Sequence, residues 1–165
     1  MQRQDQPNTR VCPFGHAPRT VQSATLNQLA VAFGSNAFGA DGPEAYLTSP
    51  SRRCFVAYDT SPPDFLGCWC TCVCRGYGGG TPPRAWITDV LVNPKHRGKG
   101  YGRCLLRLAE AGCWEAGHDQ AFVWCDSDAV GFYKRLGYVP VPSETCNVRG
   151  PDGRAVNVLV RRRGP

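Results

Sequence analysis

The 165-residue sequence predicts an α/β sandwich with a mixed, mostly antiparallel central sheet. Apolar residues at helical spacing alternate along the chain with short apolar runs that have the length and composition of strands. At residues 90–92 such a run leads into an Asn-Pro turn, a glycine-rich segment follows, and a helix-spaced stretch begins at Leu105. This region therefore predicts a strand, a loop and a helix N-terminus in sequence.

Periodicity and turn residues predict the individual elements. Residues 26–38 place their apolar side chains on one helical face. Residues 54–58 and 65–75 indicate a hairpin around a turn at 61–64, and the glycines and prolines of 76–83 indicate a mobile loop. The remaining predicted elements are a short helix at 44–47, a strand at 86–92, a helix at 102–117, a strand at 121–125, a helix at 128–136, and closing strands at 139–141 and 156–161 joined by a turn at 149–153.

The length suits a single domain, which we expect at residues 11–165. Residues 1–10 are polar and lack the apolar core of a signal peptide, so they are typical of a disordered N-terminal arm. No apolar run approaches the roughly 20 residues that a membrane-spanning helix needs. We therefore expect a cytoplasmic protein with no membrane partner, either a monomer or a homodimer.

Ten cysteines raise the question of a disulfide or metal framework. Four of them, Cys68, Cys70, Cys72 and Cys74, alternate with other residues, so in a strand they share one face at a spacing of roughly 7 Å. That spacing suits neither one tetrahedral ion nor a disulfide within the strand. We expect reduced cysteines packed in the core and no metal, whereas the alternative, a thiolate site, predicts one bound zinc per chain.

The segment Arg97-Gly98-Lys99-Gly100-Tyr101-Gly102 predicts a phosphate-binding loop. Its backbone N–H groups and the positive end of the following helix dipole can converge on a pyrophosphate. A Walker A loop is excluded because no Ser or Thr follows Lys99. The dinucleotide fingerprint is excluded because the three glycines are spaced Gly-x-Gly-x-Gly rather than Gly-x-Gly-x-x-Gly.

Two motifs together resemble the GCN5-related N-acetyltransferase (GNAT) superfamily. The first is Arg-x-x-Gly-x-Gly at 97–102, which follows a strand ending Val-x-Pro at 92–94. The second is Ala-x-x-Phe-Tyr-x-x-x-Gly-Tyr at 129–138. The resemblance implies a GNAT-type α/β sandwich and an acetyl-CoA-dependent N-acetyltransferase. Residues 128–141 are also loosely similar to the actin N-terminal acetyltransferase branch.

The resemblance also implies which residues meet acetyl-CoA. Backbone N–H groups of residues 98–102 would bind the pyrophosphate, and Arg97 and Lys99 would add positive charge. Backbone amides at 91–92 would hold the pantetheine arm and face the thioester carbonyl. Asp126 stands where many relatives carry a cofactor-contacting asparagine, so it would either keep that contact or cap the next helix. The expected cofactor-binding residues are Leu91, Val92, Arg97, Gly98, Lys99, Gly100, Tyr101, Gly102 and Asp126.

Two residues are expected to carry the catalysis. Relatives have a tyrosine at the position of Tyr133 that can protonate the coenzyme A thiolate, and a phenol is protonated at neutral pH. The alternative for Tyr133 is a core aromatic beside Phe132. Asp89 lies close to where relatives often carry an acid that reaches the amine or a bound water, and its alternative is a carboxylate in a salt bridge. Glu44 is a second candidate for the base, and His96 is expected at the surface.

The sequence describes the acceptor only in outline. The net charge of +6 suits polyanionic coenzyme A and is compatible with an acidic polypeptide. We expect acetyl transfer to a primary amine, that of a peptide or protein. The alternatives are a small-molecule amine acetyltransferase, of the polyamine or antibiotic type, and a non-catalytic coenzyme A-binding module, against which Tyr133 argues. The arginine run at 161–163 is too short to predict a nucleic-acid partner.

Overall fold

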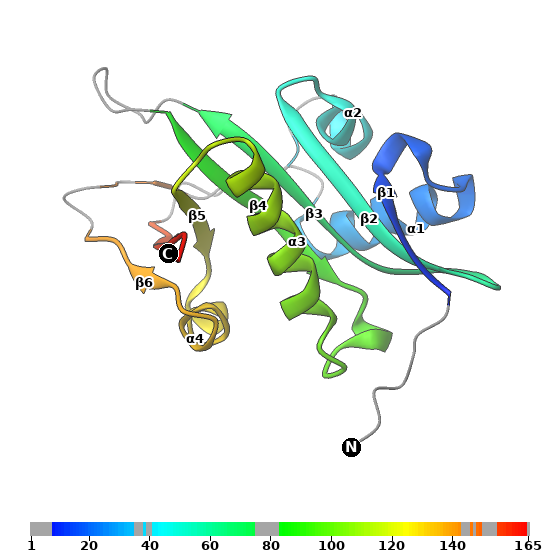
Figure 1. Cartoon of the computed structure of the whole chain (residues 1–165). Helices are drawn as coiled ribbons and strands as arrows, with labels where there is room; N and C mark the ends of the chain where they lie inside the picture. The colour runs from blue at the N-terminus through cyan, green and yellow to red at the C-terminus, as the bar shows by residue number, and fades with distance from the viewer. Residues whose placement is uncertain are drawn as a thin grey trace.

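The computed structural model of the chain describes residues 8–34, 38, 41–74, 83–142, 146, 148–149 and 155–164. Within these residues, seven strands form one sheet in the order β1-β2-β3-β4-β5-β7-β6, and only β4 and β5 pair in parallel. The expected α/β fold with a mixed, mostly antiparallel sheet is confirmed (Figure 1). The strands are β1 (Thr9–Pro13), β2 (Arg52–Thr60), β3 (Pro63–Cys74), β4 (Arg84–Val92), β5 (Gln120–Cys125), β6 (Val139–Pro140) and β7 (Asn157–Arg162). The helices are α1 (Arg19–Phe33), α2 (Gly42–Thr48), α3 (Tyr101–Glu115) and α4 (Ser127–Arg135), with short 3-10 turns at Phe14–His16 and Pro94–His96.

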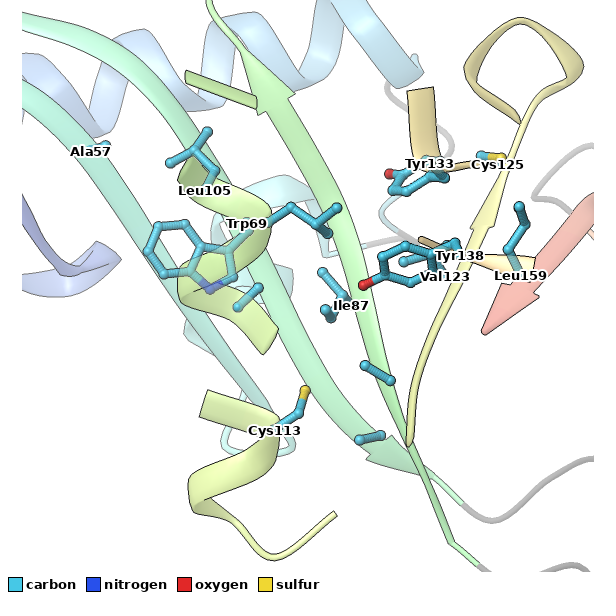
Figure 2. Close-up of a cluster of buried hydrophobic side chains, with 14 of the residues drawn as sticks. Ala57, Trp69, Ile87, Leu105, Cys113, Val123, Cys125, Tyr133, Tyr138 and Leu159 are labelled. Atoms are coloured by element: carbon cyan, nitrogen blue, oxygen red, sulfur yellow. The ribbon is translucent and has the colours of Figure 1, made fainter. Parts of the chain in front are cut away.

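The core lies in two layers, one on each face of the sheet. On one face, α1 and α2 bury Val21, Leu29 and Leu47 against β2 and β3. On the other face, α3 and α4 pack against a second cluster that includes Ile87 and Val123, drawn in Figure 2. Because alternate residues of a strand point to opposite faces, the central strands supply side chains to both layers.

The first helix starts earlier than the sequence predicts. It begins at Arg19 rather than at residue 26, and it ends at Phe33, before Gly34 takes a left-handed φ of 79°. Its first turns bury polar side chains, so the spacing of apolar residues does not reveal that part of the helix. Gln22 and Thr25 are buried there because their side chains donate hydrogen bonds to backbone carbonyls, at 2.7 and 2.8 Å.

Strand β1 is the element that the sequence analysis missed. Thr9 and Arg10 pair with Asp59 and Tyr58 of β2, so these two residues of the predicted arm belong to the sheet, and residues 1–7 lie outside the described part of the chain. As an edge strand with most side chains exposed, β1 has no apolar alternation by which to recognise it.

The hairpin of β2 and β3 is confirmed, and its strands are longer than predicted. Of the loop predicted at 76–83 only Pro83 is described, and of the turn predicted at 149–153 only Arg149, which forms an antiparallel bridge with Ala155. Among the described residues, no helix is both long and apolar enough to cross a membrane.

The cysteines of β3 take different environments. Cys68 and Cys70 are buried on the α1 face, which confirms core packing for these two. Cys72 is partly exposed, and the side chain of Cys74 lies outside the described atoms. Burial, followed by the nearby Asp89 carboxylate, raises the pKa of the Cys68 thiol. Within the described ranges, no group of three or more His, Cys, Asp or Glu side chains could hold a metal ion.

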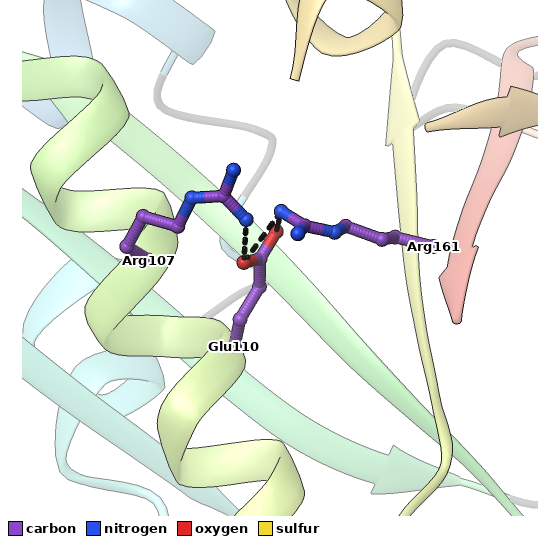
Figure 3. A network of polar contacts seen from close by, with 3 residues as sticks. All are labelled: Arg107, Glu110 and Arg161. Carbon is purple, nitrogen blue, oxygen red and sulfur yellow. Dashed lines mark hydrogen bonds and ion pairs between the residues drawn. The ribbon is translucent and has the colours of Figure 1, made fainter. Parts of the chain in front are cut away.

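A buried ion-pair network joins α3 to β7 (Figure 3). The Glu110 side chain, whose residue is 2% exposed, accepts a hydrogen bond from Arg107 at 2.8 Å, and both carboxylate oxygens accept from Arg161 at 3.0 Å. Burial raises the pKa of Glu110, and the positive charge of Arg107 opposes that shift. The positive charge of Arg161 is thus paired with Glu110 within the fold.

We predict that the change Arg161→Met lowers the free energy of unfolding by about 1–3 kcal/mol, because Glu110 stays buried but loses a charged donor to both oxygens. Urea denaturation measures the effect. The matched control is Arg162→Met on the same strand, where the side chain is exposed, and this change should cost little. Equal losses in the two variants would contradict a role for the network.

Candidate active site

Strand β4 carries a bulge in its pairing with β3. Asp89 and Val90 of β4 stand opposite the single residue Trp69 of β3. Asp89 has a φ of 55°, in the left-handed region that residues other than glycine rarely adopt. A bulge of this kind bends the strand and redirects the side chains next to it.

The bend separates β4 from β5. The two strands pair only where residues 85–87 of β4 meet residues 121–123 of β5. Beyond this point they diverge, and Figure 2 shows the Tyr133 ring between their separating ends. Tyr133 comes from α4, which follows β5 directly, so the order of elements along the chain brings this side chain to the gap.

A buried asparagine anchors the loop that follows β4. Asn93 is 6% exposed, and its side chain donates to the Phe65 carbonyl at 2.7 Å and accepts from the Lys95 N–H at 3.2 Å. Its backbone N–H donates to the Leu66 carbonyl at 2.9 Å. These three bonds fix the start of the glycine-rich segment against β3.

The glycine-rich segment forms the N-terminus of α3. Gly98 and Gly100 have φ values of 78° and 86°, and Gly100 is the N-cap residue. The Cys104 N–H donates to the Gly100 carbonyl, so the helix itself supplies no partner for the N–H groups of residues 101–103. A Cβ atom at Gly98 or Gly100 would meet nothing within 4 Å, so the backbone here is open to a ligand. The predicted anion-binding geometry is therefore present.

A cleft of about 420 Å³ joins this loop to α4 and the end of β4. Eight of the residues predicted from the sequence line it: Leu91, Val92, Arg97, Gly98, Gly100, Tyr101, Gly102 and Tyr133. The lining also includes five residues that the sequence analysis did not assign to the site: Val90, His96, Arg103, Ala129 and Phe132. Lys99 is exposed and lies outside this lining.

His96 is partly buried in the cleft rather than at the surface, which corrects the sequence expectation. Its Nε2 lies 2.9 Å from an oxygen of Asp64, at the start of β3, and its ring contacts Tyr101 edge-on at 6.0 Å between centroids. The partner is remote in sequence, so no local signal identified the pair.

Tyr133 is buried, at 8% exposure, with its ring edge-on to Phe132 and Tyr138 at 5.1 and 5.5 Å between centroids. Burial raises its pKa, and the Cys125 thiol and the Asp89 carboxylate raise it further. The phenol therefore stays protonated and is a hydrogen-bond donor across the physiological pH range. The effect of Asp89 also shows that the two predicted catalytic residues lie within electrostatic reach of each other.

The Asp89 carboxylate has a tyrosine as its partner. The Tyr46 hydroxyl of α2 donates a hydrogen bond to Asp89 Oδ2 at 2.8 Å. The expected alternative, a salt bridge, is not found for Asp89 among the described residues. The Arg52 guanidinium instead lies over the Tyr46 ring, 3.9 Å from its centroid. Sequence analysis missed Tyr46 because nothing in the short helix around it signals a contact 43 residues away.

Asp126 and Glu44 are both exposed. Asp126 occupies the N-cap position of α4, but its side chain makes no capping hydrogen bond, and only its backbone carbonyl accepts from the Ala129 N–H at 3.1 Å. It does not line the cleft. Glu44 lies in the first turn of α2, away from the hydrogen bond that Tyr46 makes.

Comparisons with known proteins agree with this geometry. Residues 24–138, more than half of the chain, match the model of the acetyltransferase (GNAT) family. A probable glucosamine 6-phosphate N-acetyltransferase of Drosophila melanogaster is 29% identical over 105 residues, which cover 59% of this chain and 46% of that protein. The chain thus spans just under half the length of this relative.

Solved structures share the fold. A Bacillus subtilis acetyltransferase in complex with CoA superposes with a TM-score of 0.66 at 14% identity, covering 94% of this chain and 99% of that one. Nourseothricin acetyltransferase superposes with a TM-score of 0.52 at 26% identity, covering 68% and 66% of the two chains. The loop, the divergent strands and the family match lead to one conclusion: the chain belongs to the acetyltransferase (GNAT) family.

Proposed function

We propose that this protein is an N-acetyltransferase that transfers the acetyl group of acetyl-CoA directly to a primary amine, with Tyr133 as general acid and Asp89 as general base. The observation that carries the proposal is the shared cleft: the open N-terminus of α3 and the buried Tyr133 line one cavity of about 420 Å³. An anion-binding helix end beside a protonated donor suits a phosphorylated thioester substrate.

The residues of the cleft fit acetyl-CoA, which supplies the activated acetyl group when bound. Backbone N–H groups at 98–102 would hold the pyrophosphate, and the Arg97 and Arg103 side chains would add positive charge at the same end of the cleft. Backbone groups at 91–92 would hold the pantetheine arm. Lys99 and Asp126 lie outside this lining, so we assign them no direct contact with the cofactor.

The protein's own groups would manage two protons. Asp89 would accept one, directly or through a water, from the ammonium form of the acceptor, so that the amine nitrogen can form a bond to the acetyl carbon. As the carbon–sulfur bond breaks, the Tyr133 hydroxyl would donate its proton to the departing sulfur. The nitrogen loses its second proton as the amide forms, and this proton would restore the phenol of Tyr133. The raised pKa of Tyr133 means that the phenol still carries its proton when the thiolate forms.

A peptide or protein amine stays our prediction for the acceptor, and the excess of positive charge supports it. An amino sugar is the second candidate. The observation in its favour is the similarity to the Drosophila protein, a probable glucosamine 6-phosphate N-acetyltransferase. A polar sugar phosphate would also suit a protein with a net charge of +6.

The phosphate loop can be tested at one glycine. We predict that Gly100→Ala weakens acetyl-CoA binding about ten-fold or more in isothermal titration calorimetry, because a side chain strains the left-handed backbone and moves the N–H groups. Gly117→Ala is the control, since Gly117 has a similar φ of 87° beyond the other end of α3. Both changes should cost about 1–2 kcal/mol of stability, and equal acetyl-CoA affinity in both variants would argue against the loop.

Tyr133→Phe keeps the ring and removes the proton. We predict that turnover falls by roughly ten- to ten-thousand-fold while acetyl-CoA affinity stays unchanged. The control is Tyr138→Phe, a neighbouring core tyrosine at 2% exposure, which should change the thermal stability rather than the turnover. Turnover of Tyr133→Phe within a factor of two of the wild type would show that another donor protonates the thiolate.

A thiol-release assay with acetyl-CoA separates the acceptor classes. We predict the highest kcat/KM for peptides with a free amino end and acidic residues, compared at equal concentration with lysine peptides, glucosamine 6-phosphate and aminoglycosides. A higher kcat/KM for glucosamine 6-phosphate would establish the second candidate. Calorimetric binding of acetyl-CoA without thiol release by any acceptor would indicate a non-catalytic module.

A further inference from the structure

The hydrogen bond from Tyr46 to Asp89 links two elements that are distant in the chain. It joins α2 to the bulge of β4, over 2.8 Å. The phenol uses Asp89 Oδ2, and no hydrogen bond to Oδ1 is found within the described part of the chain. One oxygen of the carboxylate is thus held, while the other is available to a ligand.

Tyr46 is itself fixed from two sides. Its ring lies under the Arg52 guanidinium at 3.9 Å and meets the Phe38 ring edge-on at 5.2 Å between centroids. A partly buried phenol packed in this way has few rotamers left, so it holds its hydroxyl at a defined point. The Tyr46 hydroxyl, held in this way, keeps the carboxylate of Asp89 in one orientation.

Ionisable groups from four elements lie around Asp89 and Tyr46. They are Tyr46 itself from α2, Arg52 from β2 beside the Tyr46 ring, the Cys68 and Cys70 thiols from β3, and Tyr133 from α4. Burial and the Asp89 carboxylate raise the pKa of Tyr46, so its phenol remains a proton donor. Of these groups, Tyr46 is the one that donates a short hydrogen bond to the carboxylate.

We propose that Tyr46 is the positioning residue of the active site: its hydroxyl holds Oδ2 of Asp89 so that Oδ1 faces the acceptor amine. This inference rests on the proposed role of Asp89 as general base. It gives α2 an indirect part in catalysis, because the position of this helix sets the position of the Asp89 carboxylate.

Kinetics of Tyr46→Phe test the proposal. The variant keeps the ring, so Arg52 and Phe38 retain their contacts. We expect kcat/KM for the acceptor to fall about ten-fold, the effect of one hydrogen bond to a charged group. Acetyl-CoA affinity should stay unchanged, because Tyr46 does not line the cleft. Tyr58→Phe, at a buried tyrosine of β2 beside Cys12, is the control and should leave kcat/KM unchanged.

A measurement without turnover checks the contact itself. In protein carrying tyrosine labelled with ¹³C at Cζ, the Tyr46 signal, identified by its absence from Tyr46→Phe, should have a different chemical shift in the wild type and in Asp89→Asn at the same pH. An identical chemical shift in the two proteins would overturn the contact.

The double variant separates this proposal from the assignment of the base. If Tyr46 acts through Asp89, adding Tyr46→Phe to Asp89→Asn should lower kcat/KM no further. Unchanged kcat/KM in Tyr46→Phe, with Asp89→Asn impaired, would refute the positioning role alone. Full activity in Asp89→Asn would refute the general base, and the role of Tyr46 with it.

Discussion

The bulge in β4 is the constraint on which the candidate site depends. With two residues opposite one, the strand bends away from β5 after a short parallel pairing. Unpaired backbone groups in such a gap need a partner, and a ligand that adds hydrogen bonds there completes the sheet. A regular β4 would continue its ladder with β5 and leave no opening. Tyr133 would then be one more aromatic of the core.

The gap between β4 and β5 can be part of a binding site only because α3 is held beside it. Asn93 ties the loop before α3 to β3, and Glu110 ties the second half of α3 to β7 through Arg161. Both anchors are buried polar groups, which are costly unless their partners are in place. The helix is therefore fixed at two points, so its free N–H groups keep a constant position relative to Tyr133. Comparable anchoring by Tyr46 serves the carboxylate at the bulge.

Local patterns could predict most elements, but not the polar contacts between them. The helices α3 and α4 and the strand β4 are visible as apolar periodicity, because burial of one face imposes that spacing. The start of α1 was not visible in this way, because Gln22 and Thr25 are polar residues that are buried through their hydrogen bonds. The same reason hid Tyr46 and His96, whose partners are distant in the chain. Such pairs have no period, so only the folded arrangement reveals them.

The sequence by itself determined the glycine-rich helix N-terminus and the tyrosine of α4. These features depend on φ values, on free N–H groups and on helical spacing, all of which are local. The tertiary structure decided which of the predicted residues meet: Tyr133 and the loop share a cleft, whereas Lys99 and Asp126 face solvent. It also decided the partner of Asp89. Its reach to Tyr46 depends on the bulge and on the packing of α2, and both arise from contacts between strands and helices far apart in the chain.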